Sequence, residues 1–232
     1  MQNRSHIKDH SPGKRAWRGC LTLALALAIM AVTGCVTGGS VKPSPKTQPP
    51  AAAKGVSATP ASDGREGIVI TENPKMDRAA REDFQRAVAL LNEGNHNRAI
   101  ELLEKVIQRS PKVTAPYINL ALAYERAGKL DKAEAQLKTA LSLVPDHPAA
   151  CNQYGLLCRK AGRFDEARTM YQKALARFPE YYPAHRNLGI LCDLYLNDAA
   201  CALAHYELYS QANPEDKKVK MWIADLQNRM GK

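Results

Sequence analysis

The apolar and small residues of this chain follow one pattern from about Ala80 onward, and the pattern repeats every 34 residues. A fixed period of this length is typical of an array of helical hairpins. In each repeat a glycine follows the first helix, an alanine lies where the two helices approach most closely, and a proline closes the second helix. The three sets share one register: Gly94, Gly128 and Gly162; Ala99, Ala133 and Ala167; Pro111, Pro145 and Pro179.

The same periodicity predicts nine helices, two in each of four repeats and one cap at the C-terminus. In the first three repeats they cover about 78–93 and 96–109, 115–127 and 130–143, and 148–161 and 164–177, with N-caps at Asp77 and Thr114. The fourth repeat begins near Tyr182 and has one extra residue in its turn, where Asn197 replaces the glycine. The last helix, about 215–229, carries one apolar stripe: Val219, Trp222, Ile223, Leu226 and Met230.

This register resembles that of the tetratricopeptide repeat (TPR) family, from about Asp77 to the C-terminus. Arg86, at the seventh place of the first repeat, departs from the family pattern. The resemblance implies an all-α, right-handed solenoid of about four helical hairpins over 77–232, with repeats near 80–113, 114–147, 148–181 and 182–216 and a cap at 217–232. The small residues that the family carries at its eighth place are Ala87, Ala121, Gly155 and Gly189.

The first 34 residues read as an export signal. A polar, basic stretch is followed by the uncharged segment 21–32, which is shorter than the ~20 apolar residues that a membrane span needs. The run Val32-Thr33-Gly34-Cys35 resembles the lipobox of bacterial lipoproteins, which implies cleavage before Cys35 and a diacylglyceryl group on its thiol. An ordinary cleaved signal and an uncleaved anchor are the alternatives. Because Val36 is not aspartate, the resemblance to enterobacterial lipoproteins implies the outer membrane, on its periplasmic face.

Residues 35–76 are expected to form a flexible linker behind the lipidated cysteine. Proline, glycine, serine, threonine, alanine and lysine dominate the composition, and such a segment buries too little apolar surface to fold. The short apolar run Gly67–Thr71 is the exception. It reads either as a strand that packs on the solenoid or docks a partner, or as an ordered lead-in to the first helix.

The net charge of the chain excludes few classes of partner. The chain carries +10 overall; residues 1–34 hold five Lys or Arg and one acid, or +4, so the remainder carries +6. Dense basic runs interleaved with aromatics are absent, so no nucleic-acid partner is expected. An anionic surface such as murein or lipid would suit a mildly basic domain, and solvated helix faces are the simpler interpretation.

Four cysteines remain after the predicted cleavage and lipidation: Cys151, Cys158, Cys192 and Cys201. Cys192 lies late in one helix and Cys201 early in its antiparallel neighbour, so these two form the favoured disulfide; four small buried apolar residues are the alternative. No metal-ligand spacing and no catalytic constellation is present, so neither cofactor nor enzymatic activity is expected. The histidines read as cap or surface residues.

The partner-binding groove is expected on the concave side, which the first helix of each repeat lines in this architecture. In TPR relatives that hold a peptide's C-terminal carboxylate, asparagine and cations at these places form a clamp, so an acidic or C-terminal peptide is implied here. The alternative is that the amides stabilise packing and the cations are merely solvated. The groove residues are Asn119, Arg126, Asn152, Gln153, Arg159, Lys160, Arg186 and Asn187.

The sequence therefore predicts a lipid-anchored periplasmic scaffold or adaptor that binds protein partners in a cell-envelope complex. Its layout resembles the lipoproteins that pilot type IV pilus secretins and those that scaffold murein enzymes. A binder of murein or another anionic surface is the second class of function, and an enzyme whose activity leaves no motif is the third.

Overall fold

The computed structural model describes residues 56–60, 68–72 and 75–231. The predicted signal peptide and Cys35 lie outside the described residues. Within residues 75–231 the all-α repeat architecture is confirmed, with nine helices close to the expected bounds. These are α1 (Arg78–Asn92), α2 (His96–Arg109), α3 (Thr114–Arg126), α4 (Leu130–Leu143), α5 (Pro148–Lys160), α6 (Phe164–Arg177), α7 (Tyr182–Leu194), α8 (Ala199–Ala212) and α9 (Lys217–Arg229).

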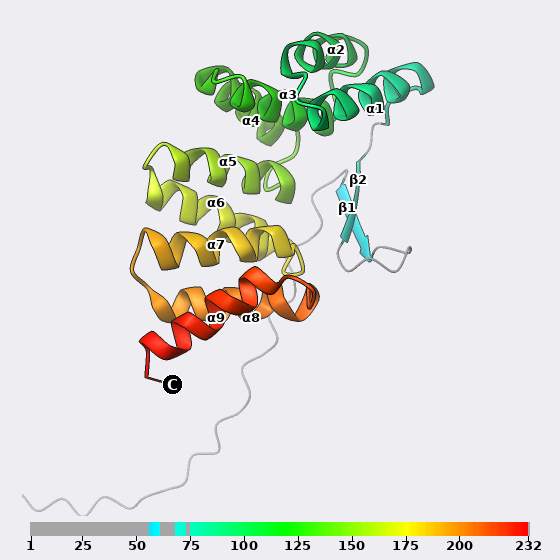
Figure 1. Cartoon of the computed structure of the whole chain (residues 1–232). Coiled ribbons are helices and arrows are strands. Elements are labelled where there is room, and N and C mark those ends of the chain that lie inside the picture. Colours follow the sequence, from blue (N-terminus) through cyan, green and yellow to red (C-terminus); the bar gives the residue numbers. More distant parts are fainter. Residues whose placement is uncertain (1–55, 61–67, 73–74, 232) are drawn as a thin grey trace, which may run out of the picture. The chain divides into compact units, whose positions relative to one another are not determined.

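Consecutive helices pair into hairpins, and the hairpins stack in chain order (Figure 1). α1 packs on α2, α3 on α4, α5 on α6 and α7 on α8, while the first helices also contact one another, α1 with α3, α3 with α5 and α5 with α7. The cap α9 packs on α8. One core of buried alanine, leucine and tyrosine side chains runs through all four hairpins, as expected where each repeat is stabilised mainly by its neighbours.

The turns adopt the left-handed conformation that the register predicts. Gly94, Gly128 and Gly162 have φ of 82°, 75° and 76°. Asn197 has φ of 50° in the longer turn between α7 and α8, so the asparagine takes over the role of the glycine there.

One predicted helix cap is confirmed and the other is wrong. The Asp77 carboxylate accepts a 2.7 Å hydrogen bond from the Ala80 amide, as an N-cap should. Thr114, however, is the first residue of α3 and is fully buried, and Val113 occupies the N-cap position. A threonine near a helix start is a common N-cap, but Thr114 is already helical and the extended residue Val113 precedes it.

Glycine at the eighth place of the repeat permits a close approach that alanine does not. A Cβ added to Gly155 would lie 2.6 Å from the ring of Tyr171, and one added to Gly189 would lie 2.5 Å from the ring of Tyr206. In the first two repeats this place holds an alanine, Ala87 and Ala121 respectively. The residues there that correspond to the tyrosines are the leucines Leu103 and Leu137. The small residue and the ring on the second helix therefore form a matched pair.

A two-stranded hairpin lies in the segment predicted as a flexible linker. β1 (Val56–Pro60) pairs antiparallel with β2 (Ile68–Glu72), with Val56 opposite Glu72 and Pro60 opposite Ile68. The apolar run at 67–71 was expected as a strand on the solenoid or a lead-in, not as a partner for 56–60. β-branched residues in both segments favour strand formation. The rest of the predicted linker, up to residue 74, is outside the described part.

Candidate partner-binding surface

The predicted groove residues come together on the first helices of three successive repeats. Asn119 and Arg126 lie on α3, the next four on α5, and the last two on α7. Because α3 contacts α5 and α5 contacts α7, side chains from neighbouring repeats meet along this row. We call the row formed by α1, α3, α5 and α7 the first-helix row.

Two of the predicted clamp cations already have partners inside the protein. Arg126 donates a 2.8 Å hydrogen bond to the carbonyl of Leu91, near the end of α1, and so satisfies a carbonyl at the helix terminus. Lys160 forms an ion pair with Glu125 at the end of α3. Both contacts join one repeat to the preceding one. These cations therefore hold the stack together, and the prediction that they form the clamp finds no support in their contacts.

The amides are also used within the protein. Asn187 on α7 donates to the Asn152 side-chain oxygen on α5 at 2.9 Å, and Asn152 is buried. Asn119 donates to the carbonyl of Ala115 in its own helix at 3.0 Å. Gln153 is half-buried on α5. The packing role, which was the alternative interpretation of the amides, describes these asparagines better than peptide binding does.

Arg159 and Arg186 are different, because neither forms an ion pair with any described residue. The guanidinium of Arg159 lies over the ring of Tyr195 at 5.6 Å, and that of Arg186 lies 5.6 Å from the ring of Trp222 and 5.9 Å from Tyr209. In each arginine the Nε atom is buried with no hydrogen-bond partner in the described part. The Nε atoms are inaccessible to a partner, but both side chains are partly exposed, and a guanidinium held on aromatic rings is suited to receive a carboxylate at its terminal N–H groups.

A pocket that sequence reasoning missed lies at the end of the first-helix row. Its volume is about 570 Å³. The cap helix α9 packs mainly on α8 and makes few contacts with α7. It therefore leaves open space beside α7, whereas α7 itself packs against α5 in the preceding repeat. The apolar stripe of α9 was the available signal, since it predicts a surface facing the last repeat. The lining residues are Ile190, Asp193, Leu194, Tyr206, Trp222, Asp225 and Arg229.

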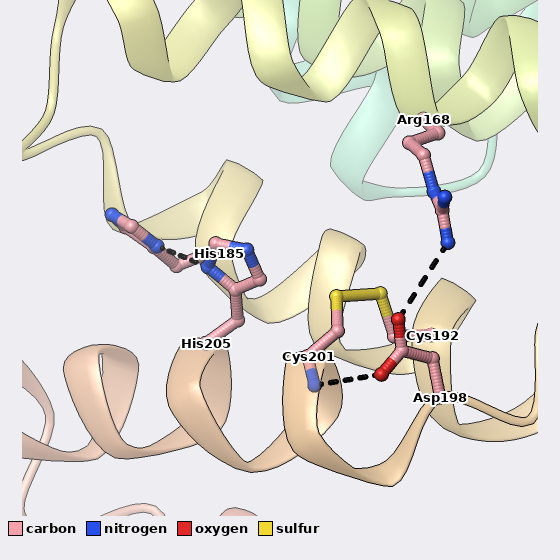
Figure 2. The surroundings of a disulfide bond; sticks show 6 residues. All are labelled: Arg168, His185, Cys192, Asp198, Cys201 and His205. Atoms are coloured by element: carbon pink, nitrogen blue, oxygen red, sulfur yellow. Dashed lines mark hydrogen bonds and ion pairs between the residues drawn. A yellow bond between two sulfur atoms is a disulfide. The ribbon is translucent and has the colours of Figure 1, made fainter. Parts of the chain in front are cut away.

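The disulfide favoured from the sequence is present in the structure. Cys192, late in α7, is bonded to Cys201, early in α8, with their Cα atoms 5.9 Å apart (Figure 2). Asp198 between them is the N-cap of α8 and accepts a 3.0 Å hydrogen bond from the Cys201 amide. Two sulfurs and a carboxylate within 4.8 Å resemble a metal site, but the sulfurs are bonded to each other and offer no thiolates.

The other two cysteines are buried thiols. Cys151 and Cys158 are free and lie in the interior of α5. Burial raises the pKa of each thiol to about 12. Since the thiolate is the reactive form, both side chains act as small apolar residues, which was the alternative considered for all four cysteines.

Two histidines lie in contact between α7 and α8, which corrects their interpretation as cap or surface residues. Nδ1 of His185 is 2.9 Å from Nδ1 of His205 (Figure 2). The other ring nitrogen of His185 is 2.8 Å from the carbonyl of Pro179. A carbonyl only accepts, so Nε2 of His185 donates to it and, in the neutral pair, Nδ1 of His185 accepts from His205. The cap interpretation holds for His147, the N-cap of α5.

This pair predicts a loss of stability in mild acid. Burial, with His185 close by, lowers the pKa of His205 to about 4, whereas an unfolded histidine titrates near 6.5. Below pH 6.5 the unfolded chain therefore binds more protons than the folded chain. The contribution of the neutral histidine pair to stability is complete above that pH and is lost as the pH falls toward 4. We expect unfolding to become easier by about 1–2 kcal/mol between pH 7 and pH 5.

Urea denaturation at the two pH values measures the effect. In His205→Asn the side-chain amide nitrogen takes the place of Nδ1 and still donates to His185 but does not titrate, so the pH dependence should shrink by about half. Glu134, whose pKa is lowered to about 2 chiefly by its hydrogen bond from Arg163, loses its ion pair only in stronger acid and does not interfere. An unchanged pH dependence in His205→Asn would contradict the assignment.

Comparison with known proteins agrees with the fold. Two tetratricopeptide repeat models match the sequence, one over residues 90–152 and one over residues 148–191. No curated protein matches the sequence. In the described part of the chain no helix is long and apolar enough to cross a membrane.

Several solved structures share the arrangement of helices. PilF of Pseudomonas aeruginosa aligns with a TM-score of 0.62 and 23% identity, over 67% of this chain and 70% of that one. PilW, described as a widely conserved type IV pilus biogenesis factor, gives 0.59 and 25% over 67% and 71%. A thermophilic TPR protein of Thermus thermophilus gives 0.58 and 24% over 66% and 82%. These likenesses show the fold.

Proposed function

From the tetratricopeptide repeats of this chain, which form a scaffold suited to protein–protein interaction, we propose a membrane-anchored periplasmic adaptor that assembles a cell-envelope complex. The observation that carries the proposal is the pair of arginines on α5 and α7. Arg159 and Arg186 are stacked on aromatic rings and form no close ion pair with any described residue, although the charge of Arg186 acts on Asp216. An acidic or C-terminal peptide supplies the missing carboxylate.

The first test is a pull-down from solubilised cell envelope with the intact chain as bait. Arg159→Ala with Arg186→Ala should weaken capture of the partner by about 30-fold or more, since each of the two lost charge-assisted contacts is worth ~1–3 kcal/mol. Arg98→Ala, an exposed arginine on α2, is the matched control and should capture normally. Equal capture by all three proteins would remove the arginines from the site.

The anchor rests on the lipobox-like run that ends at Cys35 and on the long linker behind it. Two or more acyl chains hold a protein stably on a membrane, while a single chain does not. Radiolabelled palmitate should enter the wild-type chain and fail to enter Cys35→Ser, and the variant should leave the outer-membrane fraction. Equal labelling of the two proteins would place the lipid elsewhere or exclude it. The proposal assigns no catalytic activity and no cofactor to the chain.

Among envelope systems, assembly of type IV pili or their secretins is the best-supported specific process. The support is the shared fold of PilF and of PilW, the latter a type IV pilus biogenesis factor. Deletion of the coding sequence should then abolish surface pili and be complemented by the wild-type chain. A murein- or anionic-lipid-binding role is the alternative that the +6 charge of the predicted mature chain favours, and it predicts co-sedimentation that falls steeply with salt.

A further inference from the structure

The pocket beside the cap helix has apolar walls and an open apolar edge. Ile190 and Tyr206 belong to α7 and α8, and Trp222 belongs to α9. Leu194, at the last turn of α7, is 67% exposed although it is a large apolar side chain. Leu194 extends the apolar lining of the cavity to the surface, and a cavity with mostly apolar walls and a few polar groups has the character of a binding site.

The end of the pocket near the C-terminal ends of α7 and α9 carries a surplus negative charge. Arg229 bridges two carboxylates, with 2.6 Å to Asp193 and 2.9 Å to Asp225. Asp193 is 9% exposed and is neutralised by this contact, whereas Asp225 is 67% exposed. Two carboxylates and one guanidinium leave a net charge of −1 at this end of the pocket, whereas Arg186 lies over the ring of Trp222 at the other end.

We propose that this pocket receives one large apolar side chain of a partner polypeptide, next to a lysine or arginine that pairs with Asp225. The inference rests on the proposed function and adds a second feature that the partner must carry, besides its acidic group. A pocket of about 570 Å³ admits an aromatic or long aliphatic side chain. An acidic neighbour would meet the two carboxylates of the rim, whereas a basic neighbour complements them.

The two parts of the partner-binding surface therefore favour partner groups of opposite charge. Arg159 on α5 favours an acidic group, while the pocket between α7 and α9 favours an apolar side chain beside a basic one. α7 lies between α5 and the negative end of the pocket. A partner peptide that crosses the first-helix row therefore meets opposite charges at its two ends. This order of charges distinguishes the partner from a uniformly acidic peptide.

The test is selection from a phage-displayed library of random linear peptides on the full-length protein, followed by calorimetry with the selected peptides as synthetic probes. We expect enrichment of a large apolar residue adjacent to lysine or arginine. Leu194→Ser and Asp225→Lys should each weaken these peptides at least tenfold. Leu208→Ser and Glu207→Lys, which make the same changes on α8 away from the pocket, should not.

The outcomes separate the two proposals. Peptides that bind but lose no affinity in Leu194→Ser, or that carry an acidic residue beside the apolar one, would overturn the pocket assignment and leave the scaffold function standing. Absence of any binding peptide, with both α8 control variants folded, would count against the scaffold function as well as the pocket. Circular dichroism and urea midpoints of all four variants verify that each protein is folded.

Discussion

Replacing Gly155 with alanine should destabilise the repeat domain by about 2 kcal/mol, although alanine is the better helix former. The added Cβ would lie 2.6, 2.8 and 3.0 Å from three atoms of the Tyr171 ring. Tyr171 is fully buried, so the ring has nowhere to move and the helices α5 and α6 must separate. Overpacking of this kind costs ~3 kcal/mol at the upper end, and the gain in helix propensity offsets only ~1 kcal/mol of it.

The effect of Gly155→Ala on stability should change sign when the ring of Tyr171 is removed. In the first two repeats alanine at this place corresponds to leucine at the place of Tyr171. In a Tyr171→Leu background, Gly155→Ala should therefore be neutral or stabilise the domain by up to ~1 kcal/mol. Tyr171→Leu alone should destabilise it, because the ring leaves a cavity.

Urea denaturation of the four proteins completes a double-mutant cycle. We expect a coupling free energy of about 2–3 kcal/mol between the two positions. A cycle in which the two changes simply add would show that the alanine and leucine of the first repeats are not a matched pair. Gly189 and Tyr206 provide a second, independent cycle in the fourth repeat.

The backbone of this chain could be predicted from its sequence because a repeated register constrains every position several times. Gly94, Gly128 and Gly162 each mark the same turn, and all three adopt positive φ. The extra residue in the fourth repeat could also be located, because the register resumes after it. The pairing of β1 with β2 could not be predicted in the same way, since short strands in a polar segment leave no comparable pattern.

The roles of the groove side chains were harder to predict. Arg126 and Lys160 were chosen as clamp cations from their places in the repeat, yet each contacts a residue 35 positions earlier in the chain. A place in the register tells which face a side chain is on, not whether the neighbouring repeat already supplies its partner. The recurring offset of 35 was a usable signal, because Asn187 meets Asn152 across it as well.

Loss of the disulfide should have an effect of similar size to that of Gly155→Ala. The bond between Cys192 and Cys201 closes a loop with a sequence separation of 9. In the chain-entropy model a closed loop of this length contributes about 2–3 kcal/mol by restricting the unfolded chain. Cys192→Ser with Cys201→Ser should lower the free energy of unfolding by that amount. Dithiothreitol should lower the stability of the wild type equally and leave the double variant unchanged.

Cys151→Ser provides the matched control, because its thiol is buried and free, and this variant should keep the full response to the reductant. The bond also fixes the end of α7, where Asp193 and Leu194 follow Cys192 and line the pocket. Reduction should therefore weaken peptides that use the pocket, and it should also loosen Tyr195, the ring within the closed loop on which Arg159 is stacked. If the reduced protein kept both its stability and its peptide affinity, the disulfide would have no role in shaping this end of the repeat array.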